Sequence, residues 1–260
     1  MPRLIAVIFT FLCSVEATSC DEPYVLQVGP EFSSNFMIGY LGSFTLDVAQ
    51  RIGCGTRIQG AKNYNDFLQS VIQRKADIYL VPHHFMPELV KQGFIPVIER
   101  HSTTELLYVS QIQDYKNSQF GREKPLLVFT PGPYSVDFYS INHWLKKQNI
   151  NQTQYTHDTT YASAIMKSIK QPNMVATVPM ALYDKIPQSI QKKLHVHASG
   201  INLGAYITVP EGTPKALIEA IEQSQDKLAS EHWSKPEPVK ESKYSRLFSN
   251  SFQQLLKPTK

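Results

Sequence analysis

The sequence predicts an α/β protein built from two lobes. Short β-rich runs alternate with segments of helical periodicity along most of the 260 residues. The alternation occurs twice, and no long linker separates the two runs. Strands that alternate with helices imply parallel sheets covered on both faces. The roughly 240 residues that would follow an export signal suffice for one large domain or two small lobes.

The first run of predicted elements extends from Tyr24 to Ile98. Its strands are rich in β-branched and aromatic residues, and its helices carry apolar residues at intervals of three and four. Asn63 or Asn65 would cap the second of these helices. The expected strands are 24–28, 56–59, 76–81 and 94–98, and the expected helices are 43–52, near 67–72 and 87–91.

The second run repeats this rhythm, and Pro214 takes the first-turn position that proline favours in its last helix. Its expected strands are 106–109, 126–129, a short one ending near 155, 174–178, 194–197 and 205–209. Its expected helices are 135–148, 160–169, one from 180 and 214–228. After about Glu231 the chain becomes polar and contains Pro236, Pro238 and Pro258. We therefore expect a loosely packed C-terminal tail.

The first 19 residues are predicted to be a signal peptide. Arg3 supplies one positive charge, the run 4–13 is mostly apolar, and small residues follow at Ala17 and Ser19. This is the order of a cleavable export signal. The apolar run is shorter than the ~20 residues that a membrane-spanning helix needs. Cleavage can follow Ala17, or it can precede Cys20 as in a lipoprotein.

Two cysteines remain after such cleavage, Cys20 and Cys54. An even number in an exported chain favours a disulfide. Cys20 precedes the first predicted strand and Cys54 precedes the second, and parallel neighbours would start close together. Two free buried thiols, or a lipid on Cys20, are the alternatives.

Composition and motifs exclude several classes of function. The net charge of +4 is spread along the chain without the basic cluster typical of nucleic-acid binding. The sequence contains no nucleophile elbow, nucleotide-binding loop or zinc-protease motif. The histidine pairs 83–84 and 195/197 have no acidic or cysteine partner at ligand spacing. We therefore predict no enzyme, no metal site and no cofactor.

Candidate binding residues follow the strands, because ligands of open α/β sheets sit beyond the carboxyl ends of their strands. The loop 130–135, Thr-Pro-Gly-Pro-Tyr-Ser, ends a strand and opens a helix whose N-terminus could bind an anion. Ser135 could donate to that anion, or it could simply cap the helix. His157 and Tyr64 also lie just beyond strands, where each could either reach a ligand or pack.

The order of these segments resembles the periplasmic phosphate, phosphite and phosphonate-binding proteins of ABC transporters. The similarity covers roughly residues 23–230. It is carried by a tyrosine-led helix at Tyr64 with the Ala-Asp-Ile strand and proline of 76–82, by the loop 130–135, by His157, and by 201–214.

The resemblance implies a type II periplasmic binding protein fold, in which two lobes close on a small ligand. Two segments would cross between the lobes, near 98–107 and near 199–204. Lobe 1 would comprise 20–103 and 200–235, lobe 2 would comprise 104–199, and 236–260 would be a polar tail. Ligand-binding residues carried over by position are Tyr64, Glu105, Tyr134, Ser135 and His157.

This chain departs from the family pattern at several of those positions. Pro133 and Tyr134 replace two of the usual serine or threonine residues, and proline removes one N–H donor. The strand 175–178 lacks the acid that meets an aminoalkyl group. Glu105 stands where an aromatic residue is common, and its charge would disfavour a dianion. The family ligand is therefore less well supported than the fold.

The leading hypothesis is a periplasmic solute-binding protein that captures a small anionic or zwitterionic ligand for a membrane permease. Relatives of this fold also serve as sensory subunits of membrane histidine kinases, and the polar tail would then be a contact segment. An enzyme on the same fold is the least favoured hypothesis. It would have to use His157, Asp158 or Glu105 as its acid or base.

Overall fold

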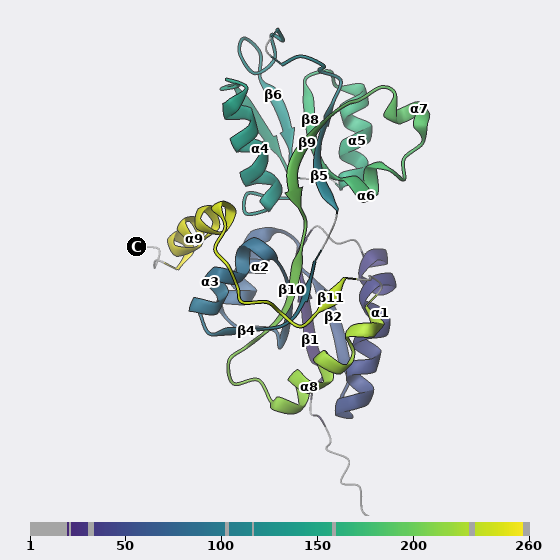
Figure 1. Ribbon diagram of the computed structural model, residues 1–260, viewed down its shortest axis with the longest axis vertical. Coiled ribbons are helices and arrows are strands. Elements are labelled where there is room, and N and C mark those ends of the chain that lie inside the picture. The colour runs from purple at the N-terminus through teal and green to yellow at the C-terminus, as the bar shows by residue number, and fades with distance from the viewer. Residues whose placement is uncertain are drawn as a thin grey trace, which may run out of the picture.

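Two sheets, one in each of two lobes, organise the protein (Figure 1). The computed structural model describes residues 20, 22–30, 34–101, 104–115, 117–157, 160–228 and 232–256. The expected signal peptide and Asp158 lie outside these residues. Within them, none of the helices combines the length and the apolar character that crossing a bilayer requires.

Lobe 1 contains a six-stranded sheet in the order β11-β4-β10-β3-β1-β2. Its strands are β1 (Tyr24–Val28), β2 (Thr56–Gly60), β3 (Ile78–Pro82), β4 (Phe94–Arg100), β10 (Ala205–Pro210) and β11 (Trp233–Ser234). Its helices are α1 (Ser34–Ile52), α2 (Tyr64–Ile72), η1 (His83–Phe85), α3 (Met86–Lys91), α8 (Lys215–Gln223) and η2 (Gln225–Lys227). Successive side chains of β1 and β3 point to opposite faces. As a result, Val25 and Tyr79 pack with α2 and α3, whereas Leu26 and Ile78 pack with α1 and α8.

Lobe 2 contains a five-stranded sheet in the order β7-β6-β8-β5-β9. Its strands are β5 (Glu105–Ser110), β6 (Leu126–Phe129), β7 (Thr153–Thr156), β8 (Met174–Pro179) and β9 (His195–Asn202). Its helices are α4 (Val136–Lys147), α5 (Tyr161–Lys170), α6 (Met180–Tyr183) and α7 (Gln188–Gln191). Ile141 and Leu145 of α4 cover one face of the sheet, and Ala164 and Ile165 of α5 cover the other.

Two connections join the lobes, from β4 to β5 and from β9 to β10. Both sheets are therefore mixed, and the expectation of purely parallel sheets is wrong. β5 runs antiparallel to β8, and β10 runs antiparallel to β3 and β4. β4 and β9 both end at the junction between the lobes. β5, which follows β4, and β10, which follows β9, therefore start at that junction. Each of them runs antiparallel to strands of its lobe that end at the junction, β5 to β8 and β10 to β3.

The C-terminal segment packs on both lobes, and the expectation of a loosely packed tail is wrong. Helix α9 (Lys243–Leu255) contacts η1 and α3 of lobe 1 and α4 of lobe 2 (Figure 1). Phe248 and Phe252 are 0% and 1% exposed. With Tyr244 they form a stripe at intervals of four residues, and this stripe faces the core although most of the other residues of the helix are polar.

Helix α1 begins at Ser34, nine residues earlier than the sequence predicts. Gly39 and Gly42 lie in the additional turns, and each costs about 1 kcal/mol of helix propensity. No side chain would be crowded there, because a Cβ built on either glycine meets nothing within 4 Å. Packing of Leu41, Phe44 and Val48 against the sheet stabilises the helix despite its glycines.

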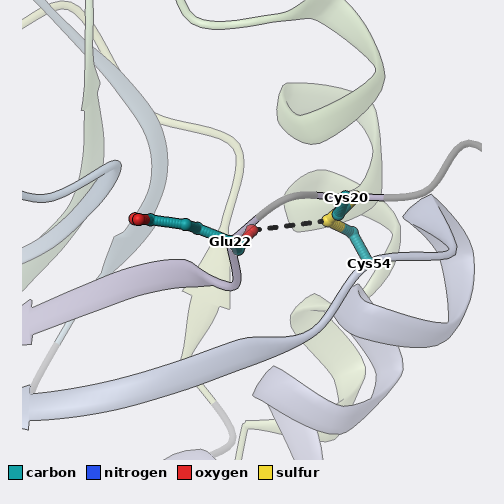
Figure 2. The surroundings of a disulfide bond; sticks show 3 residues. All are labelled: Cys20, Glu22 and Cys54. Atoms are coloured by element: carbon teal, nitrogen blue, oxygen red, sulfur yellow. Dashed lines mark hydrogen bonds between the residues drawn. A yellow bond between two sulfur atoms is a disulfide. The ribbon is translucent and has the colours of Figure 1, made fainter.

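Cys20 and Cys54 form a disulfide, as the sequence predicts (Figure 2). Their Cα atoms are 5.6 Å apart, within the usual range for such a bond. The parallel pairing of β1 with β2 brings the two cysteines together, since Tyr24 stands opposite Thr56. The Cys54 sulfur also lies 3.9 Å from the Glu22 carbonyl oxygen.

Candidate functional site

A cavity of about 830 Å³ lies between the lobes. Lobe 1 contributes the carboxyl ends of β3 and β4, and lobe 2 contributes the N-termini of α4, α5 and α6. A third wall comes from the segment between β11 and α9, with Glu237 and Lys240, and from Tyr244 in the first turn of α9. The cavity is therefore completed by residues far apart in the sequence. Its volume falls within the range of small-molecule sites.

The lobe 2 wall is shaped by capped helix ends. Ser135 caps α4, because its Oγ accepts a hydrogen bond of 3.1 Å from the Phe138 N–H and donates one of 2.8 Å to the Gly132 carbonyl. Thr160 caps α5 in the same way through the Ser163 N–H at 3.3 Å. The positive dipole ends of both helices thus point toward the cavity.

Asp137 stands in the first turn of α4 and lines the cavity, although it is only 3% exposed. The Tyr161 hydroxyl donates to its Oδ1 at 3.2 Å. Burial raises the pKa of this carboxyl to about 6, and hydrogen bonds from Thr177 and Tyr161 oppose the shift. Among the described residues, no cation lies within ion-pair distance of Asp137.

The lobe 1 wall contains Glu99, a buried carboxylate at the end of β4. It accepts a hydrogen bond of 3.0 Å from the Glu237 N–H, and its Oε1 lies 3.3 Å from His83 Nε2 and 3.7 Å from His101 Nδ1. Burial lowers the pKa of His83, and the Glu99 charge opposes that change. Burial, reinforced by Glu99, raises the pKa of the Tyr206 phenol. Glu99 is thus engaged by its neighbours.

Arg100 is the next residue along β4 and also lines the cavity. It is paired in the sheet with Ala205 of β10 and Trp233 of β11, so its backbone is fixed on both sides. One guanidinium nitrogen donates to the Tyr40 hydroxyl at 3.3 Å. The buried Nε of Arg100 has no hydrogen-bond partner among the described residues.

Direct contacts between the lobes close one side of the cavity. The buried His84 of lobe 1 donates from Nε2 to the Tyr134 carbonyl oxygen of lobe 2 at 2.9 Å. Burial lowers the pKa of His84 to about 4, and the hydrogen bond to Tyr134 opposes the shift. Next to this bond, Gly132 lies against the Tyr64 ring, where an added Cβ would be 2.4 Å from Cδ2.

Of the five residues predicted to bind ligand, Tyr64 alone is among the described residues that line the cavity. Ser135 caps its helix, and Tyr134 offers its carbonyl to His84. His157 Nδ1 donates to the Thr130 carbonyl at 3.0 Å, and the Gly200 N–H donates to Glu105 Oε1 at 2.6 Å. Four of the five are therefore engaged beside the cavity.

Sequence reasoning overlooked two charged groups of the cavity wall, the partly buried Arg100 and the buried Asp137. The rule that sites lie at carboxyl ends of strands could have found Arg100, but the predicted strand ended at Ile98. Asp137 stands two residues after Ser135, where an acid ordinarily serves the helix dipole at the surface. Only the packing of α4 reveals that this acid is buried.

Solved structures share this architecture, whereas no family model matches the chain and no curated protein is similar to it. The binding protein component PA3383 of an ABC phosphonate transporter from Pseudomonas aeruginosa has a TM-score of 0.66 at 12% identity, covering 92% of this chain and 90% of that one. PhnD1 from Prochlorococcus marinus, in complex with methylphosphonate, has a TM-score of 0.60 at 13% identity, covering 90% and 99%.

XAC2383 from Xanthomonas citri, bound to ATP, has a TM-score of 0.63 at 12% identity, covering 89% of this chain and 98% of that one. These likenesses extend over almost the whole of each chain. The chain accordingly has the type II periplasmic binding protein fold that its sequence predicts.

Proposed function

We propose that this protein is a periplasmic solute-binding protein that captures a small oxyanion or phosphonate-like ligand between its lobes for an ABC transporter. The observation that carries the proposal is the cavity of about 830 Å³ whose walls come from both lobes. Two lobes joined by short crossing segments can close on a ligand by hinge motion. A cavity at the hinge is the place where such closure would trap it.

The fold neighbours support this function. PA3383 is a component of an ABC phosphonate transporter, and PhnD1 holds methylphosphonate. The cavity wall can hold an anionic group, because Arg100 and Lys185 line it together with the positive dipole end of α5. PA3383 is itself a binding protein component, so we propose binding rather than catalysis.

Tyr64 remains in the proposed site because it lines the cavity. Ligand contact by Glu105, Tyr134, Ser135 and His157 stays a prediction. The side chains of Glu105, Ser135 and His157 would each have to exchange a present hydrogen bond for one to the ligand. The described state therefore favours a ligand position closer to Arg100 and Asp137.

The periplasm is the proposed compartment. Export would follow from residues 1–19, and an oxidising compartment would maintain the Cys20–Cys54 bond. A sulfur bonded to Cys54 is not free to carry a lipid, which favours the disulfide over the lipoprotein alternative. The proposed partner is a membrane permease. In the sensory alternative the polar tail would contact a kinase, whereas α9 in that tail packs against both lobes.

Calorimetry on the exported protein tests the function with a panel of phosphate, phosphite, methylphosphonate, arsenite and amino acids. We expect saturable binding of at least one compound and a smaller radius of gyration by X-ray scattering when it is bound. Ala162→Trp places a bulky ring at an exposed position of the cavity wall, so it should abolish that binding without unfolding the protein. Binding of no compound, or turnover of the bound one, would contradict the proposal.

A further inference from the structure

Two groups of opposite charge, the partly buried Arg100 and the buried Asp137, face the cavity from different lobes without an ionic partner among the described residues. Arg100 belongs to β4 of lobe 1, and Asp137 belongs to α4 of lobe 2. Neither makes an ion pair with any residue that the structure describes. An unpaired charge out of water is costly, so such groups ordinarily find a partner.

The guanidinium of Arg100 is only partly satisfied by the protein. Its hydrogen bond to the Tyr40 hydroxyl leaves the buried Nε without an acceptor within the described chain. The carboxylate next to it in sequence, Glu99, is occupied by the Glu237 N–H and stands near His83 and His101. Arg100 is thus available for a carboxylate or phosphonate group, to which a guanidinium can donate two parallel hydrogen bonds.

Asp137 offers a carboxyl group that could pair with a positively charged part of the ligand. Neutral donors hold it, namely the hydroxyls of Tyr161 and Thr177, and its carboxyl faces the cavity at 3% exposure. An anion placed at the N-terminus of α4 would meet this carboxylate and be repelled. An ammonium group placed there would instead complete an ion pair and leave the hydroxyl hydrogen bonds intact.

We propose that the ligand is a zwitterion whose oxyanion pairs with Arg100 and whose ammonium group pairs with Asp137. This inference rests on the solute-binding function proposed above and narrows its ligand class. Tyr64, Tyr161, Tyr206 and Tyr244 line the same cavity and can cover the part of the ligand between its two charges. The cavity volume of about 830 Å³ leaves room for a ligand larger than a tetrahedral oxyanion.

The pH dependence of binding has a definite sign. The Tyr161 hydroxyl donates to the Asp137 carboxyl, and the phenol of Tyr108, whose pKa burial raises to about 12, also lies near it. An ammonium group favours ionised Asp137, whose pKa burial raises to about 6. Zwitterion affinity should therefore rise from pH 5 to pH 7, and binding at pH 5.5 should release protons. An anion alone favours the protonated acid and gives the opposite trend.

Matched probes test the charge requirement by calorimetry on the full exported chain. One pair is 2-aminoethylphosphonate and ethylphosphonate, and the other is L-phenylalanine and 3-phenylpropionate. We expect a zwitterion to bind at least about 30-fold more tightly than its partner without the ammonium group, since leaving one member of a buried charge pair alone is costly. Asp137→Asn should remove this preference, and Arg100→Gln should weaken binding of the zwitterion by a similar factor.

Exposed residues provide the controls: Glu123→Gln and Arg122→Gln make the same chemical changes in lobe 2 away from the cavity. They should leave the affinity unchanged. Equal binding of both members of a pair, or affinity that falls from pH 5 to pH 7, would overturn the zwitterion while leaving solute binding in place. Binding of none of the four probes also overturns it, and the wider anion panel then decides whether solute binding itself survives.

Discussion

His84 Nε2 of lobe 1 donates a hydrogen bond of 2.9 Å to the carbonyl oxygen of Tyr134 in lobe 2. Because His84 is buried, its replacement by alanine leaves that carbonyl without its donor. We expect His84→Ala to lower the free energy of unfolding by about 1 to 3 kcal/mol and to increase the radius of gyration. Urea unfolding and X-ray scattering measure the two effects. The exposed His195→Ala should change neither, and an unaltered radius in His84→Ala would argue against a lobe-locking bond.

The pKa shifts of His84 and Asp137 act on stability in opposite directions as the pH changes. The pKa of His84 is lowered from 6.5 to about 4, so the unfolded chain binds more protons in this range and acid destabilises the fold. The pKa of Asp137 is raised from 3.8 to about 6, so the folded chain binds more protons and acid stabilises it. In the wild type these two effects largely cancel between pH 4 and pH 6.

Single substitutions should separate the two effects. Asp137→Asn removes the acid-stabilising group, so the variant should lose about 1 to 3 kcal/mol more than the wild type on acidification from pH 7 to pH 4. His84→Gln should do the reverse and lose less. Urea midpoints across this range measure both slopes. Parallel pH profiles for the wild type and Asp137→Asn would show that Asp137 titrates normally.

Gly132 is expected to tolerate no side chain, because a Cβ there would lie 2.4 Å from the Tyr64 ring of the other lobe. Gly132→Ala should push the lobes apart, with lower stability and a larger radius of gyration. Adding Tyr64→Ala should return the radius of gyration toward that of the wild type by removing the obstacle. Gly42→Ala in α1 is the control, since its Cβ meets nothing within 4 Å and alanine favours the helix. Equal scattering curves for Gly132→Ala and Gly42→Ala would contradict the expected separation of the lobes.

Helix α9 is expected to depend on Phe248, which stacks on Phe85 with ring centroids 3.9 Å apart. Phe248→Ala should cost about 3 to 5 kcal/mol of unfolding free energy, as for other buried aromatic residues. It should also raise hydrogen exchange across 243–255. The adjacent Leu247→Ala, at a side chain 39% exposed, should have little effect on either measurement. Exchange that stays slow in Phe248→Ala would mean that α9 is held by other contacts.

The disulfide closes a segment with a sequence separation of 34. Reduction should lower the free energy of unfolding by about 2 to 4 kcal/mol, mainly because the unfolded chain gains freedom. Urea unfolding with and without reductant measures the loss. The double variant Cys20→Ala, Cys54→Ala should show no response to reductant. Mass spectrometry of the oxidised protein should find the two cysteines linked, and free thiols at both would contradict the bond.

The alternation of strands and helices made the fold class predictable, because hydrophobic periodicity is a local property of the chain. The C-terminal helix was missed for a related reason. Its apolar residues, Tyr244, Phe248 and Phe252, occupy one narrow stripe among polar residues, and three nearby prolines suggested disorder. The mixed sheets were also missed, since strand direction depends on where the chain crosses between lobes rather than on strand composition.

The site was predictable only to the level of its loops. The segment 130–135 does lie at the junction of the lobes, but Ser135 uses its hydroxyl to cap α4. Two residues further on, Asp137 is the side chain that reaches the cavity. Which of two neighbouring residues faces a cavity depends on the rotation of the helix, and packing against the rest of the protein sets that rotation.

The connections between β4 and β5 and between β9 and β10 also bear on how the protein is made. The sheet of lobe 2 is drawn from one continuous stretch, 105–202, whereas the sheet of lobe 1 needs residues from 24 to 234. Contiguous units fold as their sequence becomes available. Lobe 2 can therefore fold while the C-terminal part of the chain is still being synthesised. Lobe 1, and with it a complete cavity, must await release of the C-terminus.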